Sequence, residues 1–143
     1  MKIRLVMLGK TKRVELRAML DDYLLRIGRS CEIAVSELRE STDAAFGRLK
    51  IDPAAHLVLL DAAGKNFSSQ EFARWLSALR DRGSRELVFL CGDDVGFPVS
   101  FRKRAVESLS LSRLTMPHEL ARVVLAEQIY RAFAILSGHP YAK

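Results

Sequence analysis

Two histidines near the end of the chain have side chains that could carry out acid–base chemistry. His118 and His139 flank a long helical segment expected from about Glu119 to Ser137. Histidine is the side chain whose proton exchanges most readily near neutral pH. His118 is expected at the N-terminal end of the helix, where the helix dipole favours a neutral imidazole that can accept a proton. A surface histidine with a local hydrogen bond remains an open alternative, and His56, which begins an apolar run, is interpreted as structural.

A loop of alternating serine and leucine comes before this helix. Residues 108–117 read SLSLSRLTMP, and their apolar side chains would be costly to expose unless they wrap a ligand or fill the core. Gly92 and Gly96, which follow another expected strand, allow a ligand to approach the backbone closely, although an ordinary turn explains them equally well. The common phosphate-binding patterns GxGxxG and GxxxxGK[ST] are absent, so a nucleotide-like ligand would bind to backbone groups of such loops.

The elements that would position these groups alternate between strand and helix. Strands are expected at 2–8, 31–38, 56–61, 86–91 and 108–111. Helices are expected at 11–27, 41–50, 68–82, 100–107 and 119–137. The continuous apolar run HLVLLD is typical of a central parallel strand, and a loop is expected at 62–65 after it. This order predicts an α/β fold with a mostly parallel sheet and helices on both faces, in which a ligand binds beyond the carboxyl ends of the strands.

The long terminal helix is apolar on more than one side. Such a helix is buried on more than one side. A chain of 143 residues is expected to form one domain, 1–143, with one core. The second apolar side is therefore predicted to meet a partner subunit. Arg122, Glu127 and Arg131 interrupt the helix and exclude a membrane span, which needs roughly 20 apolar residues in a row.

The charge balance moderately favours a polyanionic partner. The formal net charge is +6, from 23 Lys and Arg against 17 Asp and Glu. The excess lies mainly in residues 1–30 and recurs at 102–104 and Arg113, which favours RNA over a merely solubilising surface. Cys31 and Cys91 have no CxxC partner, so we expect reduced thiols buried in strands of a cytoplasmic protein, and no metal site. No signal peptide is expected either.

Longer stretches resemble a known family. The segments LSLSRLTMPHELARVVLAEQIYRA and GHPY are similar to the RlmH (YbeA-like) family of SPOUT methyltransferases. LLDAAGKNFSSQEFARWL and the start KIRLVMLGK resemble it as well, so the likeness covers nearly the whole chain. The resemblance implies a single SPOUT domain with a C-terminal trefoil knot, a rare exception to the rule that chains are unknotted. It also implies a homodimer with the cofactor pocket against the subunit interface.

The resemblance further implies an activity and its residues. The cofactor would be S-adenosylmethionine, and the product would be N3-methylpseudouridine in 23S rRNA of the ribosome. The implied cofactor-binding residues are Leu60, Gly92, Leu111, Ser112, Arg113, Leu114, Thr115, Met116 and Pro117. The residues implied around the methyl acceptor are His118, Arg122, His139 and Tyr141. One of the two histidines would take the proton from N3, and Arg122 or a basic residue of the partner would stabilise the developing oxyanion.

The chain departs from the family pattern at one loop. Cys91 stands where the family usually has the first of two glycines, and the loop CGDDVG is one residue longer. A side chain there could weaken cofactor binding, so a non-catalytic RNA-binding or ribosome-binding protein with the same fold is the main alternative. Asp93 and Asp94 either face the cofactor's amino group or sulfonium, or form an Asx-type turn. A flavodoxin-like nucleotide binder would not explain the two-sided terminal helix.

Overall fold

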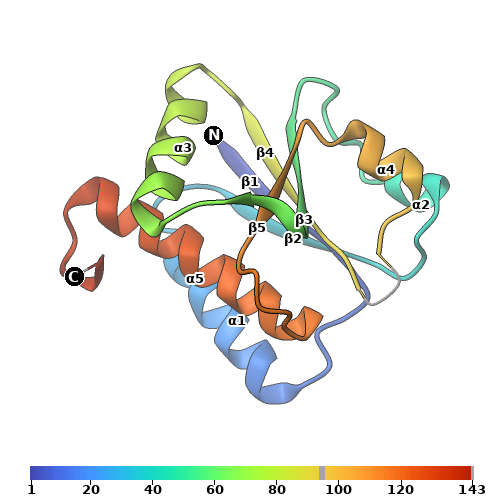
Figure 1. Ribbon diagram of the computed structural model, residues 1–143, viewed down its shortest axis with the longest axis horizontal. Helices are drawn as coiled ribbons and strands as arrows, with labels where there is room; N and C mark the ends of the chain where they lie inside the picture. The colour runs from blue at the N-terminus through green and yellow to red at the C-terminus, as the bar shows by residue number, and fades with distance from the viewer. Residues whose placement is uncertain (94–95, 143) are drawn as a thin grey trace.

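Strands and helices alternate along the chain, as Figure 1 shows for this computed structural model, which describes residues 1–93 and 96–142. The strands are β1 (Lys2–Leu8), β2 (Ile33–Leu38), β3 (His56–Asn66), β4 (Glu86–Cys91) and β5 (Glu107–Ser110). The helices are α1 (Val14–Ile27), α2 (Asp43–Gly47), α3 (Ser69–Asp81), α4 (Val99–Arg104) and α5 (His118–Ser137), followed by the short 3-10 helix η1 (Pro140–Ala142).

The five strands form one parallel sheet in the order β2-β1-β4-β3-β5. Side chains alternate across it, so the central strands supply two cores. Ile3 and Phe89 belong to one core, whereas Val6 and Val88 belong to the other. Each of these four side chains is fully buried, as expected for parallel strands that are covered on both faces. The α/β fold predicted from the sequence is confirmed.

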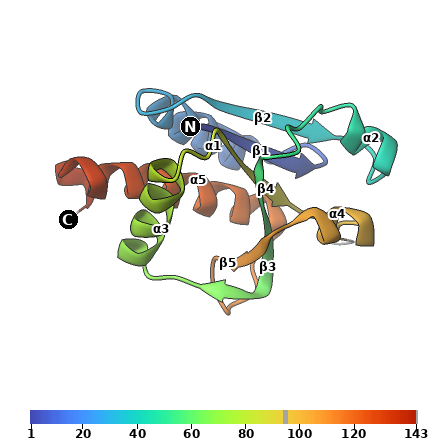
Figure 2. The same ribbon diagram turned by 90° about the horizontal axis from the view of Figure 1, so that it is seen from above.

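The helices are divided unequally between the two faces. Buried residues of α1, α3 and α5 pack into one core, and those of α2 and α4 pack into the other. Figure 2 shows α2 and α4 on one side of the strands and the three longer helices on the opposite side. Within the described residues, no helix is both long and apolar enough to cross a lipid bilayer.

The third strand is longer than predicted. The loop expected at 62–65 is part of β3, which continues to Asn66. Leu60 and Lys65 both pair with Leu109 of β5, so the intervening residues form a bulge. A Cβ on Gly64 would lie 2.7 Å from the carbonyl carbon of Ser108, so the two backbones touch at a point where only glycine fits. Glycine usually weakens a strand, and it can also mark such a close approach.

The remaining boundaries differ by a few residues. The first helix begins at Val14 instead of residue 11, and α2 covers only 43–47 of the expected 41–50. The end of the chain follows the prediction closely, because α5 stops at Ser137 and Gly138 adopts a left-handed φ of 71°. The expectation that both thiols lie buried in strands is half right, since Cys91 is buried in β4 but Cys31 is half-buried and precedes β2.

Candidate active site

A cavity of about 410 Å³ opens at the carboxyl edge of the sheet. Its walls come from the middle of β3 at residues 59–62, from the ends of β4 and β5, from the loop after β4 with Arg102 of α4, and from the loop before α5 with the first turn of α5. The cavity lies beyond the carboxyl ends of β4 and β5, the side of the sheet where the alternating elements predicted a ligand, and the bulged part of β3 adds the remaining wall. The described lining residues are Leu59, Leu60, Asp61, Ala62, Cys91, Gly92, Asp93, Gly96, Phe97, Arg102, Leu109, Leu111, Ser112, Leu114, Thr115, Met116, His118 and Ala121.

Most of the expected cofactor residues line this cavity. Leu60, Gly92, Leu111, Ser112, Leu114, Thr115 and Met116 do so. Arg113 and Pro117 belong to the same loop but are exposed outside the lining. Side chains that the sequence did not single out as pocket residues also contribute, notably Phe97 and Arg102. The run of basic residues at 102–104 was visible in the sequence, but nothing there showed which of them faces the cavity.

The serines of the loop hold it in shape. The Ser110 hydroxyl donates to the carbonyl oxygen of Ser112 at 3.0 Å, and the Leu114 N–H donates to the Ser112 hydroxyl at 2.9 Å. These bonds satisfy polar groups locally, as serine commonly does in turns. The apolar side chains between them can then face the cavity, which explains the alternation of Ser and Leu in the sequence.

Gly92 and Cys91 determine how closely a ligand can approach β4. A Cβ built on Gly92 would lie 3.6 Å from the Phe97 ring, an ordinary contact, so the fold itself tolerates a side chain there. Cys91 is buried, and its pKa is raised to about 12 by burial. The thiol is therefore neutral at physiological pH. It lines the cavity without closing it, so the cysteine in the place of the family's glycine leaves room for a ligand.

Asp93 takes part in a turn and in the pocket wall. Its carboxylate oxygen Oδ1 accepts the Gly96 N–H at 3.1 Å, which supports the turn interpretation of this residue. Asp93 also lines the cavity together with Asp61 and Arg102. The wall thus carries both carboxylates and a guanidinium. The corresponding prediction for Asp94 falls on a residue outside the described part of the chain.

His118 is the one expected acceptor-side residue that reaches the cavity. It is the first residue of α5, is half-buried and lines the pocket beside Ala121. The start of α5 is fixed by Glu119, whose Oε1 accepts the backbone N–H groups of Lys12 at 2.7 Å and Arg13 at 3.0 Å. The hydrogen bond from the Arg13 N–H is the main cause of the lowered pKa of Glu119. This arrangement holds the imidazole at the pocket's edge.

Arg122 lies away from the cavity. Its side chain is fully buried. One guanidinium nitrogen donates to the Thr11 hydroxyl at 3.0 Å and the other to the Leu8 carbonyl oxygen at 2.5 Å. Burial lowers the pKa of Arg122, although neighbouring acids including Glu119 act against this. The structure therefore places Arg122 as a link between α5 and the end of β1, outside the cavity lining, and its expected role near the methyl acceptor stays a prediction.

His139 and Tyr141 are at the opposite end of α5 from the cavity (Figure 1). A helix of 20 residues such as α5 is about 30 Å long, so the two ends of α5 are far apart. The tail is attached to its own chain, because the Tyr141 hydroxyl donates to Glu127 at 2.9 Å and lies 3.2 Å from the Tyr23 hydroxyl. The Tyr141 N–H donates to Nδ1 of His139 at 3.1 Å. Burial raises the pKa of the Tyr141 phenol.

The described residues contain no cluster of three or more His, Cys, Asp or Glu side chains that could hold a metal ion.

Comparison with known proteins identifies relatives of the whole chain. A family model described as "Predicted SPOUT methyltransferase" matches residues 1–142. Proteins named "Ribosomal RNA large subunit methyltransferase H" are similar over nearly the full length of both chains. The protein from Geotalea daltonii is 41% identical, covering 99% of each chain. The protein from Solibacter usitatus is 42% identical, covering 100% of each.

A solved structure supports the fold alone. It is described as a probable methylase family protein from Haemophilus influenzae Rd KW20, and it superimposes with a TM-score of 0.63 at 10% sequence identity. The match covers 95% of this chain and 68% of that chain.

Proposed function

The chain belongs to the SPOUT methyltransferase family, and we propose that it transfers a methyl group from S-adenosylmethionine to N3 of a pseudouridine in 23S rRNA. Full-length relatives named as methyltransferases of the ribosomal RNA large subunit support the substrate class. The observation that carries the proposal is the open cavity at the carboxyl edge of the sheet, with His118 on its wall. The reaction would take place in the cytoplasm, on the ribosome, in one domain comprising residues 1–143.

The cavity suits the methyl donor in size and chemistry. Its volume of about 410 Å³ falls within the range of small-molecule sites, roughly 300–1,000 Å³. Leu60, Leu111 and Met116 offer apolar contacts for an adenine ring, and Gly92 lets a ligand approach the backbone. Asp93 and Arg102 carry the opposite charges that the amino and carboxylate groups of the donor require. When bound, S-adenosylmethionine supplies a methyl group on a positively charged sulfur.

His118 is the proposed general base. N3 of pseudouridine carries a proton and must lose it before the nitrogen can attack, and a positioned base contributes roughly 10²–10⁴ in rate. His118 lines the cavity. His139 is less suitable, because its Nδ1 accepts the Tyr141 N–H and a neutral ring then holds its proton on Nε2. In this conformation His139 can donate a hydrogen bond to the acceptor base but cannot take its proton.

We propose that the protein acts as a homodimer, because the residues expected around the acceptor are divided between the two ends of α5. We infer that His139 and Tyr141 serve the acceptor of a second subunit, since His139 follows the far end of α5 from their own pocket and the Tyr141 hydroxyl is bound to Glu127, roughly 14 Å along the helix from His118. Leu114 on the pocket wall is 79% exposed, and Leu120 in the first turns of α5 is 38% exposed. Exposed apolar side chains beside a site are typical of a surface that a partner covers. The C-terminal trefoil knot expected from the family resemblance belongs to the same proposal.

The proposal is tested by mapping modified nucleosides of 23S rRNA by mass spectrometry. We expect N3-methylpseudouridine to be missing in a strain that lacks the gene and to return when the gene is supplied. In vitro, transfer of a labelled methyl group to free rRNA and to assembled ribosomes identifies the substrate form. An unchanged modification pattern in the deletion strain would contradict the proposed activity. Calorimetry with S-adenosylmethionine distinguishes it from a non-catalytic RNA-binding protein, which would bind no donor.

A further inference from the structure

Two groups of basic side chains lie on opposite sides of the cavity. The loop cations are Lys10, Lys12 and Arg13, between β1 and α1. The α4 cations are Arg102, Lys103 and Arg104, which form the last turn of α4. All six side chains are exposed. The sequence of α4, VSFRKR, contains no acidic residue that could neutralise them.

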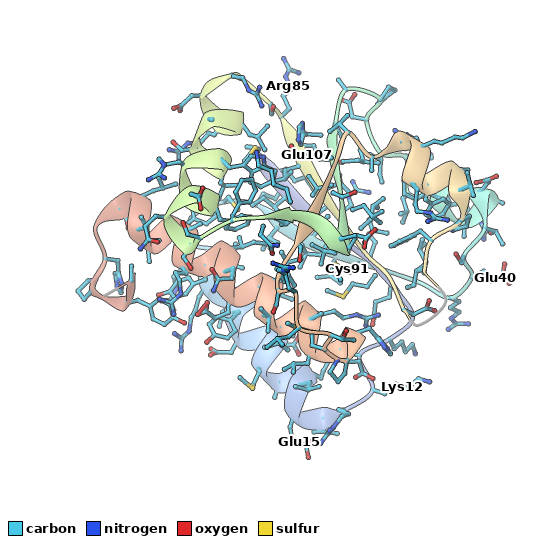
Figure 3. The ribbon with its side chains drawn as sticks, viewed as in Figure 1. Lys12, Glu15, Glu40, Arg85, Cys91 and Glu107 are labelled. Atoms are coloured by element: carbon cyan, nitrogen blue, oxygen red, sulfur yellow. The ribbon has the colours of Figure 1, made fainter. Side chains whose placement is uncertain are left out.

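The fold brings both groups to the edge where the cavity opens. Met7 pairs with Cys91, so the loop after β1 lies beside the end of β4. The backbone of Lys12 and Arg13 is bound to Glu119, next to His118 on the cavity wall. On the other side, α4 follows the loop after β4, and its Arg102 lines the cavity. Figure 3 shows Lys12 near the start of α5, pointing away from the protein.

Hydrogen bonds and stacking leave these cations available to a ligand. Glu119 uses one oxygen for two backbone N–H groups of the loop, so it orders the loop through its backbone. Arg13 and Glu15 approach to 4.0 Å with both side chains more than 70% exposed, and such surface pairs contribute little. The guanidinium of Arg104 lies 5.3 Å from the centre of the Phe46 ring, a contact that positions it without cancelling its charge.

Basic residues also lie at the opposite edge of the sheet, where the strands begin. Several basic residues there approach acidic ones, as Lys2 does Glu32 at 3.7 Å and Arg80 does Asp81 at 4.0 Å. Arg4 and Glu86 approach to 3.7 Å and are mostly buried. At the cavity, by contrast, the last turn of α4 carries three basic residues and the helix has no acidic one.

We propose that the loop cations and the α4 cations bind phosphates of the substrate RNA on the two sides of the cavity, so that the target base lies over the pocket between them. Lys and Arg bind nucleic-acid backbones by neutralising phosphates and releasing counterions. Contacts on both sides fix the register of the strand, while recognition of the base is left to the pocket. This inference rests on the proposed RNA methyltransferase function and adds the surface that would hold the RNA.

The experiment measures binding of the full-length protein to a 23S rRNA transcript at several salt concentrations. The loop variant carries Lys10→Gln and Lys12→Gln, and the α4 variant carries Lys103→Gln and Arg104→Gln, which leaves Arg102 on the pocket wall intact. Each lost phosphate contact lowers the slope of log K against log salt by about 0.7–0.9. We therefore expect each variant to bind more weakly and to have a slope smaller by about one to two.

Arg82→Gln with Arg85→Gln is the matched control. It makes the same change in charge at the opposite edge, where Figure 3 shows Arg85, and should leave the affinity and the slope unchanged. Thermal unfolding and S-adenosylmethionine calorimetry should give wild-type values for all variants, which separates RNA binding from folding and from donor binding. Wild-type slopes in both test variants, or an equal loss in the control, would overturn the proposed surface while methyl transfer by the wild type still upheld the activity. A wild type that neither bound nor methylated rRNA would instead refute the activity.

Discussion

His118 and Arg122 are one helical turn apart on α5, yet only the histidine faces the cavity. The arginine side chain turns to the end of β1, where the Leu8 carbonyl and the Thr11 hydroxyl accept its hydrogen bonds. The sequence placed both residues at the start of the last helix. The sequence could not show that Arg122 would connect α5 to the end of β1, because its hydrogen-bond partners are more than 100 positions away along the chain.

Replacing His118 by alanine should slow the chemical step. Removal of a general base costs roughly 10²–10⁴ in rate, and we expect this loss in single-turnover methyl transfer with saturating rRNA and donor. His139→Ala should reduce the rate less, since its Nδ1 is occupied as an acceptor in the structure. If both variants transfer methyl groups at the wild-type rate, neither histidine is the base.

Gly92→Ala should weaken donor binding without weakening the fold. The added Cβ would meet Phe97 and Gly96 at 3.6 Å, which is ordinary packing distance. It would also stand where a ligand approaches the backbone of the cavity. We expect at least a tenfold increase in the Kd for S-adenosylmethionine by calorimetry, with a wild-type melting temperature. Equal affinities would show that the donor does not lie against Gly92.

Cys91 should make the protein less stable at alkaline pH. Burial raises the pKa of its thiol to about 12, above the unfolded value of about 8.5. The folded state therefore keeps a proton that the unfolded chain releases, so stability is complete below the unfolded pKa and falls as the pH rises toward the folded one. In urea titrations between pH 8 and 11, Cys91→Ala should lose stability less steeply than the wild type. Parallel curves would contradict the pKa assignment.

At the scale of the elements, long apolar runs were predicted well and short segments poorly. The strand HLVLLD and the terminal helix were both located correctly, because burial on all sides leaves a continuous pattern in the sequence. The extension of β3 through Ala62 to Asn66 was missed. Its residues look like a turn in isolation, and their strand conformation depends on β5, which lies more than 40 positions later.

Gly64→Ala should therefore destabilise the protein markedly. Its Cβ would lie 2.7–2.8 Å from backbone atoms of Ser108 and Leu109, and backbone cannot move aside as a flexible side chain can. Overpacking of this kind costs about 1–3 kcal/mol, which urea unfolding can measure. Gly47→Ala is the matched control, because nothing lies within 4 Å of a Cβ there. A Gly64→Ala variant as stable as this control would show that the two strands are farther apart.

At the scale of the whole molecule, the separation of His118 from the tail predicts complementation between subunits. A His118→Ala protein and a His139→Ala, Tyr141→Ala protein should each be weakly active. After the two are unfolded together and refolded as a mixture, methyl transfer should rise above that of either protein alone. In each mixed dimer, one pocket would contain an intact His118 and receive an intact tail.

The control is the same mixture assembled without unfolding, in which subunits have not exchanged. Its activity should equal the average of the two separate proteins. A refolded mixture that shows no gain over this average would mean that the tail does not serve a neighbouring pocket, and that His139 and Tyr141 act elsewhere or only stabilise α5.

The helix α5 forms hydrogen bonds with the end of β1 and with the loop that follows it. The Arg122 guanidinium donates to the Leu8 carbonyl oxygen, and the Glu119 carboxylate accepts the backbone N–H groups of Lys12 and Arg13. During translation the N-terminus emerges first, at about 5–20 residues per second. At that rate, roughly 5–20 seconds pass between the synthesis of residues 8–13 and that of residues 119–122, which bind them. In that interval the apolar stretch KIRLVML is available to chaperones, and this part of the fold can form only after residues 119–122 have been made.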